Sequence, residues 1–286
     1  MGATLVTDSK SQLLSQTQWV AKLLSLFKFV GLASIYFFML SPLIFVIWLS
    51  FFADSIPAFP PTGYSLKWYV NAWENQTFMD GLVLSLKLGV IAAFGSVVFG
   101  TAAAIALNTP TMVGRSLIRS ILLSPLVVPS IVAGVAVYLF FLRAEDVLDR
   151  NVVGTFPALV IAHICITIPW TLRLVTANLE SIDVTIEEAA SNLGASAMVV
   201  FWRVTLPMLR PAIVASTLFS FIISFENLEV TLPLVGPGQT TLPIAIMQYL
   251  EFSLDPTIAA VSAVQIALLA IVMVVSNRFV KISQVI

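Results

Sequence analysis

The chain has 286 residues, of which 59% are hydrophobic and only 10% are charged, and its mean hydropathy is +1.00. Because soluble domains carry about 25% charged residues, this composition excludes a soluble globular protein and indicates an integral membrane protein. The 14 basic residues nearly balance the 15 acidic ones without a basic patch for nucleic acid, and the single Cys165 excludes an intramolecular disulfide or a cysteine-based metal site.

Six apolar runs are each long enough to cross a hydrocarbon core of about 30 Å as a helix. Residues 1–28 are predicted to be a polar cytoplasmic lead, and residues 29–286 a single transmembrane domain. The first run is longer than the core of a signal peptide, so it is expected to remain as an anchor. The sequence therefore predicts an all-α membrane protein with six transmembrane helices, at residues 29–52, 82–107, 120–142, 156–176, 212–234 and 257–280.

The distribution of Lys and Arg predicts the orientation, because cytoplasmic loops of membrane proteins are enriched in both. With the N-terminus inside, only Lys67, Lys87, Arg143 and Arg150 face outward. Both termini, and the long polar insert between the fourth and fifth spans, are then cytoplasmic. The ten inner residues are Lys10, Lys22, Lys28, Arg115, Arg119, Arg173, Arg203, Arg210, Arg278 and Lys281.

The first outer loop, residues 53–81, contains three prolines, which disfavour a helix, and the aromatic residues Trp68, Tyr69 and Trp73. Aromatic side chains of this kind anchor a protein at the level of the lipid headgroups. They would equally suit contact with an extracytoplasmic partner, and the sequence leaves both interpretations open.

The second span carries a stripe of small side chains at every fourth position: Ala92, Ser96, Gly100 and Ala104. In lipid such a stripe lets another helix approach closely. The neighbouring helix could belong to this chain or to another subunit.

Prolines are expected to bend the third span, at Pro125 and Pro129, and the fourth, at Pro169. The fourth span also contains His163, the only histidine of the chain. A lone histidine within a membrane is more often part of a hydrogen-bonded structure than a ligand, so no role is predicted for it.

The sequence of the insert between the fourth and fifth spans predicts two short helices joined by a glycine. Glu187 and Glu188 lie in the first turn of a helix that Gly194 is expected to end, and the helix dipole favours carboxylates there. Ser196 can begin a second helix, which Pro207 closes before the fifth span.

The residues of this insert resemble a known motif. Glu188, Ala189, Ala190 and Gly194, followed after nine residues by Val204-Thr205-Leu206-Pro207, resemble the EAA loop of permeases in binding-protein-dependent ABC importers, with Val204 in place of Ile. In that family the loop is a coupling helix that sits in a cleft of a separate ATPase subunit. The alternative is an amphipathic surface hairpin without a partner. The resemblance assigns ATPase coupling to Glu187, Glu188, Ala189, Ala190, Gly194, Leu206 and Pro207.

The fifth span is unusual because Glu226, Asn227 and Glu229 interrupt its apolar sequence. A carboxylate costs about 2.5–3.5 kcal/mol at mid-membrane on insertion scales, so these side chains are expected to face protein or water. As a continuous helix, the span would place both carboxylates on one face. They could attract a cationic solute, with Phe221 and Phe225 available for cation–π contact, or pair with Arg143, Arg150 or Lys87.

The stretch from Ser224 onward resembles spermidine/putrescine permeases. In those proteins a polar cluster with adjacent acidic residues precedes a Gly-Pro turn and a helix that begins Leu-Pro, as Gly236-Pro237 and Leu242-Pro243 do here. The acidic pair of the relatives is Glu226-Asn227 in this chain, and Glu229 is an addition. The resemblance implies uptake of a small cationic solute such as putrescine or spermidine across a bacterial inner membrane.

The same resemblance implies the partners: two ATPase subunits, a second and non-identical permease, and an extracytoplasmic binding protein, all acting in membrane lipid. ATP and magnesium would bind the ATPase, because this chain has no GxxxxGK[ST] phosphate loop. It also lacks hydrolase motifs, so no catalytic residue, cofactor or metal is expected on it and the chain is not predicted to be an enzyme.

Three other functions remain open. Related permeases carry iron, phosphonates, thiamine and amino-acid derivatives. A secondary transporter could use Glu226 and Glu229 for cation coupling, although no internal repeat relates residues 29–142 to residues 156–280. A membrane scaffold would have a partner for the loop but no solute.

Overall fold

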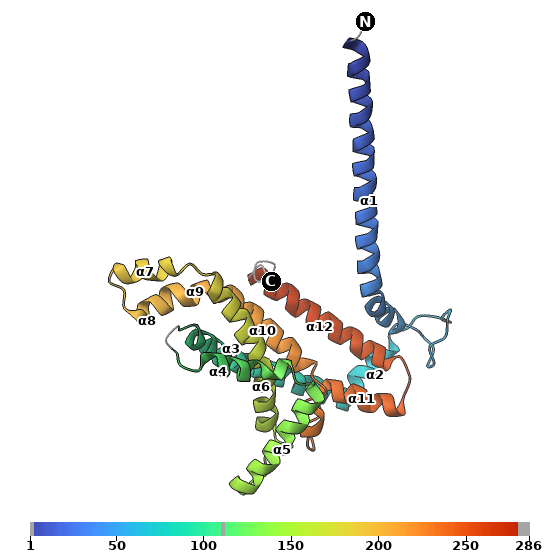
Figure 1. Ribbon diagram of the computed structural model, residues 1–286. Coiled ribbons are helices and arrows are strands. Elements are labelled where there is room, and N and C mark those ends of the chain that lie inside the picture. Colours follow the sequence, from blue (N-terminus) through green and yellow to red (C-terminus); the bar gives the residue numbers. More distant parts are fainter. Residues whose placement is uncertain (1–2, 110–111, 280–286) are drawn as a thin grey trace.

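The computed structural model describes residues 3–109 and 112–279. Within these residues the chain is helical apart from turns and one isolated bridge between Phe52 and Tyr64, which confirms the all-α fold (Figure 1). Lys281 and the end of the last expected span lie outside the described residues. The longer helices are α1 (Ala3–Leu49), α2 (Lys67–Glu74), α3 (Gln76–Asn108), α4 (Arg115–Leu123), α5 (Ser130–Leu148), α6 (Phe156–Ser181), α7 (Val184–Asn192), α10 (Arg210–Phe225), α11 (Leu242–Phe252) and α12 (Thr257–Phe279). The shorter ones are η1 (Ser124–Leu126), α8 (Ala197–Val200), the π-helix η2 (Phe201–Thr205), α9 (Leu206–Met208) and η3 (Leu232–Leu234).

Helices α3, α6 and α10 form the centre of the bundle. The small-residue stripe of the second span lies on α3 and is buried, with Ala92, Ser96 and Ala104 fully covered. A side chain at Gly100 would put its Cβ 2.7 Å from the Cβ of Thr171 on α6. The neighbour that the stripe admits is therefore a helix of this chain, and close backbone approach holds α3 against α6.

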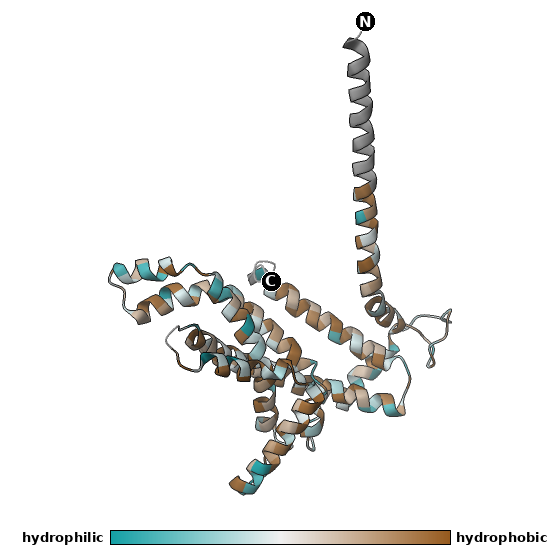
Figure 2. Cartoon of the chain, in the orientation of Figure 1, coloured by the Kyte–Doolittle hydropathy of each residue, from teal (hydrophilic) through white to brown (hydrophobic). Residues whose placement is uncertain are grey.

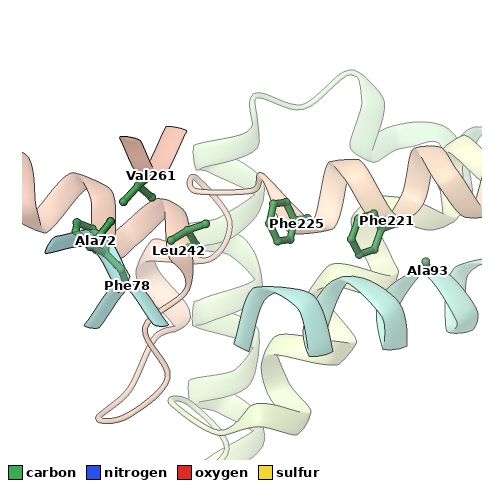
Figure 3. Close-up of a cluster of buried hydrophobic side chains, with 8 residues drawn as sticks. Ala72, Phe78, Ala93, Phe221, Phe225, Leu242 and Val261 are labelled. Carbon is green, nitrogen blue, oxygen red and sulfur yellow. The ribbon is translucent and has the colours of Figure 1, made fainter. Parts of the chain in front are cut away.

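Apolar side chains fill the space around this centre. One cluster joins α10 to α3, α11 and α12 through Phe221, Phe225, Leu242 and Val261, with Ala93 facing the phenylalanines from α3 (Figure 3). Lipid tails are as apolar as these side chains, so moving the side chains out of lipid gives no hydrophobic gain. Their burial stabilises the bundle through van der Waals packing instead.

The first helix differs from the others because it projects away from the bundle (Figure 1). Its apolar part, Leu24–Leu49, has none of its residues buried, and hydrophobic residues predominate along it (Figure 2). The expected lead and first span are thus one continuous helix, whose apolar part begins and ends earlier than residues 29–52. Such a helix needs lipid or another protein around it.

The third span was expected to be a single helix, and this prediction was wrong. Residues Arg115–Leu126 and Ser130–Leu148 meet at an angle of 110°. Pro129 is the reason: it precedes α5 in an extended conformation, and it has no N–H to continue the helix before it. The expected bend at Pro125 and Pro129 is present, but it is a break.

The fifth span also differs from its expected bounds of residues 212–234. Helix α10 begins at Arg210, after a bend of 61° from the preceding segment at Leu209, two residues before Pro211, and it ends at Phe225. The remaining residues form turns and η3. Among the described residues, four helices can cross a membrane by length and composition, and six can if each bent pair counts as one span.

Candidate functional site

The insert between α6 and α10 folds into a hairpin, hereafter the 184–208 hairpin, that projects from one end of the bundle (Figure 1). Its first helix, α7, begins three residues before Glu187 because the Asp183 side chain accepts a 3.0 Å hydrogen bond from the backbone N–H of Thr185. This bond, together with the Thr185 side chain, lowers the pKa of Asp183 from its usual 3.8. An Asp directly before a helical run is typical of the residue that caps the N-terminus of a helix, so the sequence contains a signal for the start of α7.

Gly194 ends α7 as the sequence predicts. Its φ is +88°, and its N–H bonds the carbonyl of Ser191 while the N–H of Ala195 bonds the carbonyl of Ala190. These two bonds are the Schellman pattern of a helix C-terminus, which requires a left-handed residue at this position. The direction in which the chain turns toward α8 is therefore set by a glycine.

A side-chain bond closes the hairpin. The Thr205 hydroxyl donates to the Glu187 carboxylate over 2.5 Å, which joins α7 to the π-helix η2. Thr205 is buried, whereas Glu187 is half-buried. In the sequence Glu187 directly precedes the motif and Thr205 lies within it, but the contact between them could not be inferred from spacing alone.

The outer surface of the hairpin is a mixture of polar and apolar side chains. Glu188 and Ala189 are exposed, and so are Leu193, Met198 and Trp202, which are 90%, 66% and 59% exposed. Exposed apolar side chains that form a patch mark contact with another protein or with the membrane. Leu206 and Pro207 are half-buried in α9, at the base of the hairpin, so the motif residues divide between its exposed surface and its attachment to the bundle.

The carboxylates of the fifth span lie in a turn, hereafter the acidic turn, formed by residues 226–231. Glu226 caps the C-terminus of α10, so Glu226 and Glu229 do not share a helical face as expected. The Asn227 side chain accepts a 2.9 Å bond from the N–H of Val230 and holds the turn together. Both glutamates are exposed, and within the described part of the chain neither forms an ion pair.

The basic residues considered as partners lie elsewhere. Arg143 pairs with Asp146 over 3.4 Å on the exposed end of α5. Lys87 lines a separate cleft of about 400 Å³ with Asp80 and Gly238. The structural ion-pair interpretation of Glu226 and Glu229 therefore has no support within the described residues.

The aromatic residues do not lie where the sequence placed them. Phe221 and Phe225 stack on each other at 5.6 Å and are only 8% and 1% exposed (Figure 3). The expectation that their faces are available for cation–π contact does not hold in this structure, because both rings belong to the apolar core.

A cavity of about 200 Å³ lies beside the acidic turn, where the chain breaks between η1 and α5. Asn227 and Val230 line it from the turn, and Trp170 and Ile166 line it from α6. Trp170 is half-buried and stacks on Phe219, so this ring is an aromatic surface close to the turn that the sequence analysis missed. Among residues 3–109 and 112–279, no group of His, Cys, Asp or Glu could hold a metal ion.

Residues 96–284 match the family described as binding-protein-dependent transport system inner membrane component. This match covers most of the chain and includes both the hairpin and the acidic turn. The chain belongs to this family. It is an inner-membrane permease of an ABC importer, a transport component and not an enzyme.

Three curated relatives of the permease are named for two kinds of solute. The putrescine transport system permease protein PotI of Escherichia coli (strain K12) is 29% identical over 215 residues, covering 73% of this chain and 75% of PotI. The spermidine/putrescine transport system permease protein PotC of the same strain is 25% identical, covering 87% and 91%. A protein of Salmonella paratyphi A named as a 2-aminoethylphosphonate transport system permease, PhnV, is 30% identical, covering 77% and 82%.

A solved structure supports the fold of the permease. The bacterial ABC transporter involved in the import of the acidic polysaccharide alginate contains a chain that matches with a TM-score of 0.70 at 18% identity. The alignment covers 90% of this chain and 96% of that one. At this identity the likeness concerns the arrangement of the helices alone.

Proposed function

We propose that this permease moves a small cationic solute of the polyamine class, such as putrescine or spermidine, into the cytoplasm. An extracytoplasmic binding protein would deliver the solute, and two ATPase subunits would drive its passage. A second, non-identical permease would complete the pathway. The observation that carries the proposal is the pair of exposed carboxylates in the acidic turn, neither of which forms an ion pair with a described residue.

Charge across the last third of the chain supports a cationic solute. Between Arg210 and Arg278 the sequence contains Glu226, Glu229, Glu251 and Asp255 but no Lys or Arg. A surface of one charge sign attracts the opposite ion and raises its local concentration. Putrescine carries two ammonium groups, so the two carboxylates of the acidic turn complement its charge.

Coupling to the ATPases would run through the 184–208 hairpin. Its exposed Glu188 and Ala189, with Leu193 beside them, offer a mixed polar and apolar surface to a cleft. The hairpin connects directly to α6 and α10, so movement of the ATPases would be passed to both helices. The excess of basic residues on the same side supports a cytoplasmic hairpin and cytoplasmic termini.

The second candidate solute is 2-aminoethylphosphonate, which the likeness to PhnV favours. This molecule carries an ammonium group and also a phosphonate, which needs cationic partners such as Arg. The absence of Lys and Arg between residues 210 and 278 weighs against it. Iron, thiamine and amino-acid derivatives have no observation in their favour.

The test is uptake of radiolabelled putrescine by the complete transporter in proteoliposomes with ATP inside. Glu226→Gln combined with Glu229→Gln should lower uptake about tenfold or more. Glu74→Gln is the matched control, because Glu74 is also exposed but lies at the end of α2, outside the acidic segment between residues 210 and 278. Unchanged uptake by the double variant would overturn the cationic pathway.

A further experiment separates the importer from a secondary carrier. The chain alone in liposomes, given an ion gradient and no ATPase, should show no uptake of putrescine. Uptake under these conditions would contradict the proposal, because it would show that the ion gradient can drive transport without ATP hydrolysis.

A further inference from the structure

His163 lies on α6 at the level of the acidic turn and is completely buried. Its Nδ1 is 2.8 Å from the Ser224 hydroxyl, and its Nε2 is 3.1 Å from the Thr231 hydroxyl. Ser224 comes just before the acidic turn, in the last turn of α10, and Thr231 closes the turn. One imidazole therefore connects both ends of the segment that carries Glu226 and Glu229.

The hydrogen bonds determine which ring nitrogen carries the proton. The Thr231 hydroxyl donates its single hydrogen to the carbonyl of Asn227 over 2.7 Å. Thr231 can therefore only accept from His163, which makes Nε2 the donor. The described residues place no carboxylate against the ring, so a buried imidazolium would lack a compensating charge, and the neutral ring accepts from Ser224 at Nδ1. All three hydroxyl and imidazole groups are then satisfied.

Bonds within the acidic turn and contacts from two helices hold its shape. The Asn227 side chain accepts from the N–H of Val230, the Thr231 hydroxyl donates to the Asn227 carbonyl, and the N–H of Leu232 bonds the carbonyl of Leu228. From α5, Gly134 packs so closely that a Cβ there would lie 2.8 Å from the carbonyl oxygen of Glu229. Among the described residues, the side-chain hydrogen bonds that reach this segment from another long helix are those of His163 on α6.

We propose that His163 is a positioning residue that fixes the acidic turn, and with it the direction in which Glu226 and Glu229 are presented to the solute. This inference rests on the proposed function for the nature of the solute. It goes beyond that function by assigning a role to a residue that does not contact the solute. The same helix α6 continues into the 184–208 hairpin, so His163 also ties the turn to the helix that the hairpin would move.

The first test compares three variants of the complete transporter. His163→Leu removes both bonds, and His163→Gln retains an amide N–H that can reach Thr231 in place of Nε2. Thr167→Val is the matched control, because Thr167 is one turn away and fully buried but bonds only carbonyls of its own helix, at 2.7 and 3.2 Å.

His163→Leu should raise the KM for putrescine about tenfold while kcat changes less than twofold. His163→Gln should recover most of this loss, and Thr167→Val should resemble the native protein. A merely structural role would instead lower yield and kcat together in His163→Leu without rescue by Gln. That result would overturn the proposal.

The second test does not depend on the solute. Val230 in the acidic turn is 1% exposed, so Val230→Cys in a Cys165→Ser background should react slowly with a water-soluble thiol reagent. Adding His163→Leu should speed labelling about tenfold, whereas adding Thr167→Val should not. Faster labelling without putrescine transport by the native protein would reject the solute but retain the role of His163. Equal labelling rates in all three proteins would reject that role.

Discussion

Thr205 donates a hydrogen bond to Glu187, 18 residues away in the sequence, and so closes the hairpin that joins α6 to α10. Glu187 immediately precedes Glu188, the first residue of the EAA-like pattern, and Thr205 lies between Val204 and Leu206 near its end, so the contact joins one arm of the hairpin to the other.

This contact predicts that the arms separate when either partner is lost. Glu187→Ala or Thr205→Val should each destabilise the hairpin by about 1 kcal/mol, since Glu187 is half-buried and a bond to a charged group is partly screened there. The measurement is hydrogen exchange of α7 in the complete transporter, together with uptake. The double variant should cost no more than either single one.

Glu188 supplies the contrast for this experiment. It is exposed, so Glu188→Ala should leave exchange of α7 unchanged but lower ATPase stimulation by the loaded binding protein. Additive losses in the Glu187 and Thr205 double variant would show that the bond does not couple the two arms.

Gly194 is the second point of prediction. Its φ of +88° is costly for other residues, and nothing lies within 4 Å of a Cβ placed there. Gly194→Val should therefore cost about 1–2 kcal/mol through the backbone alone and redirect α8. Uptake and stimulated ATPase activity should fall severalfold while membrane insertion is retained.

Asparagine provides the control at the same position. It tolerates the left-handed conformation, so Gly194→Asn should retain most of the coupled activity. If Gly194→Val transported as well as the native permease, the fixed direction of the hairpin would have no part in coupling.

The sequence predicted the hairpin well because its signals are local. An acidic helix start, a glycine stop and prolines at the far end each act within a few residues. The acidic turn was harder, since Glu226 and Glu229 have the spacing of a helical face and no proline or glycine marks the end of α10 at Phe225.

The missing information at the acidic turn is tertiary. Gly134 on α5 packs against the backbone of the turn, and His163 on α6 forms hydrogen bonds with its two ends. Both residues are remote from the turn in sequence. In the same way Phe221 and Phe225 are ordinary aromatic residues in the sequence, and only the packing of α3 and α11 shows that they are core. Contacts of this kind cannot be read from periodicity.

Gly100 tests the packing of α3 on α6. A methyl group at this position would meet Thr171 at 2.7 Å, so Gly100→Ala should destabilise the bundle by about 1–3 kcal/mol. Thermal inactivation of the transporter in detergent should then occur at a lower temperature. Gly31→Ala is the control, because a Cβ placed at Gly31 on α1 would meet no other part of the protein within 4 Å, and alanine favours a helix. A shift as large in Gly31→Ala would show that the loss is not due to the contact with Thr171.

Asp183 gives the hairpin a defined response to pH. Its pKa is lowered from 3.8 by the bonds from Thr185, so the capped start of α7 is stabilised when the carboxylate is ionised. This stabilisation is fully present above the unfolded value and is lost as the pH falls through the folded one, so it should not vary between about pH 5 and 8. Hydrogen exchange at the Thr185 amide, corrected for its intrinsic rate, should accelerate only when the pH falls below 3.8, the usual pKa of an aspartate. Asp183→Asn keeps an acceptor oxygen and has no charge to lose, so it should abolish the acid response. In Asp183→Ala the Thr185 amide should exchange rapidly at every pH. If the acid response persisted in Asp183→Asn, it would belong to another group.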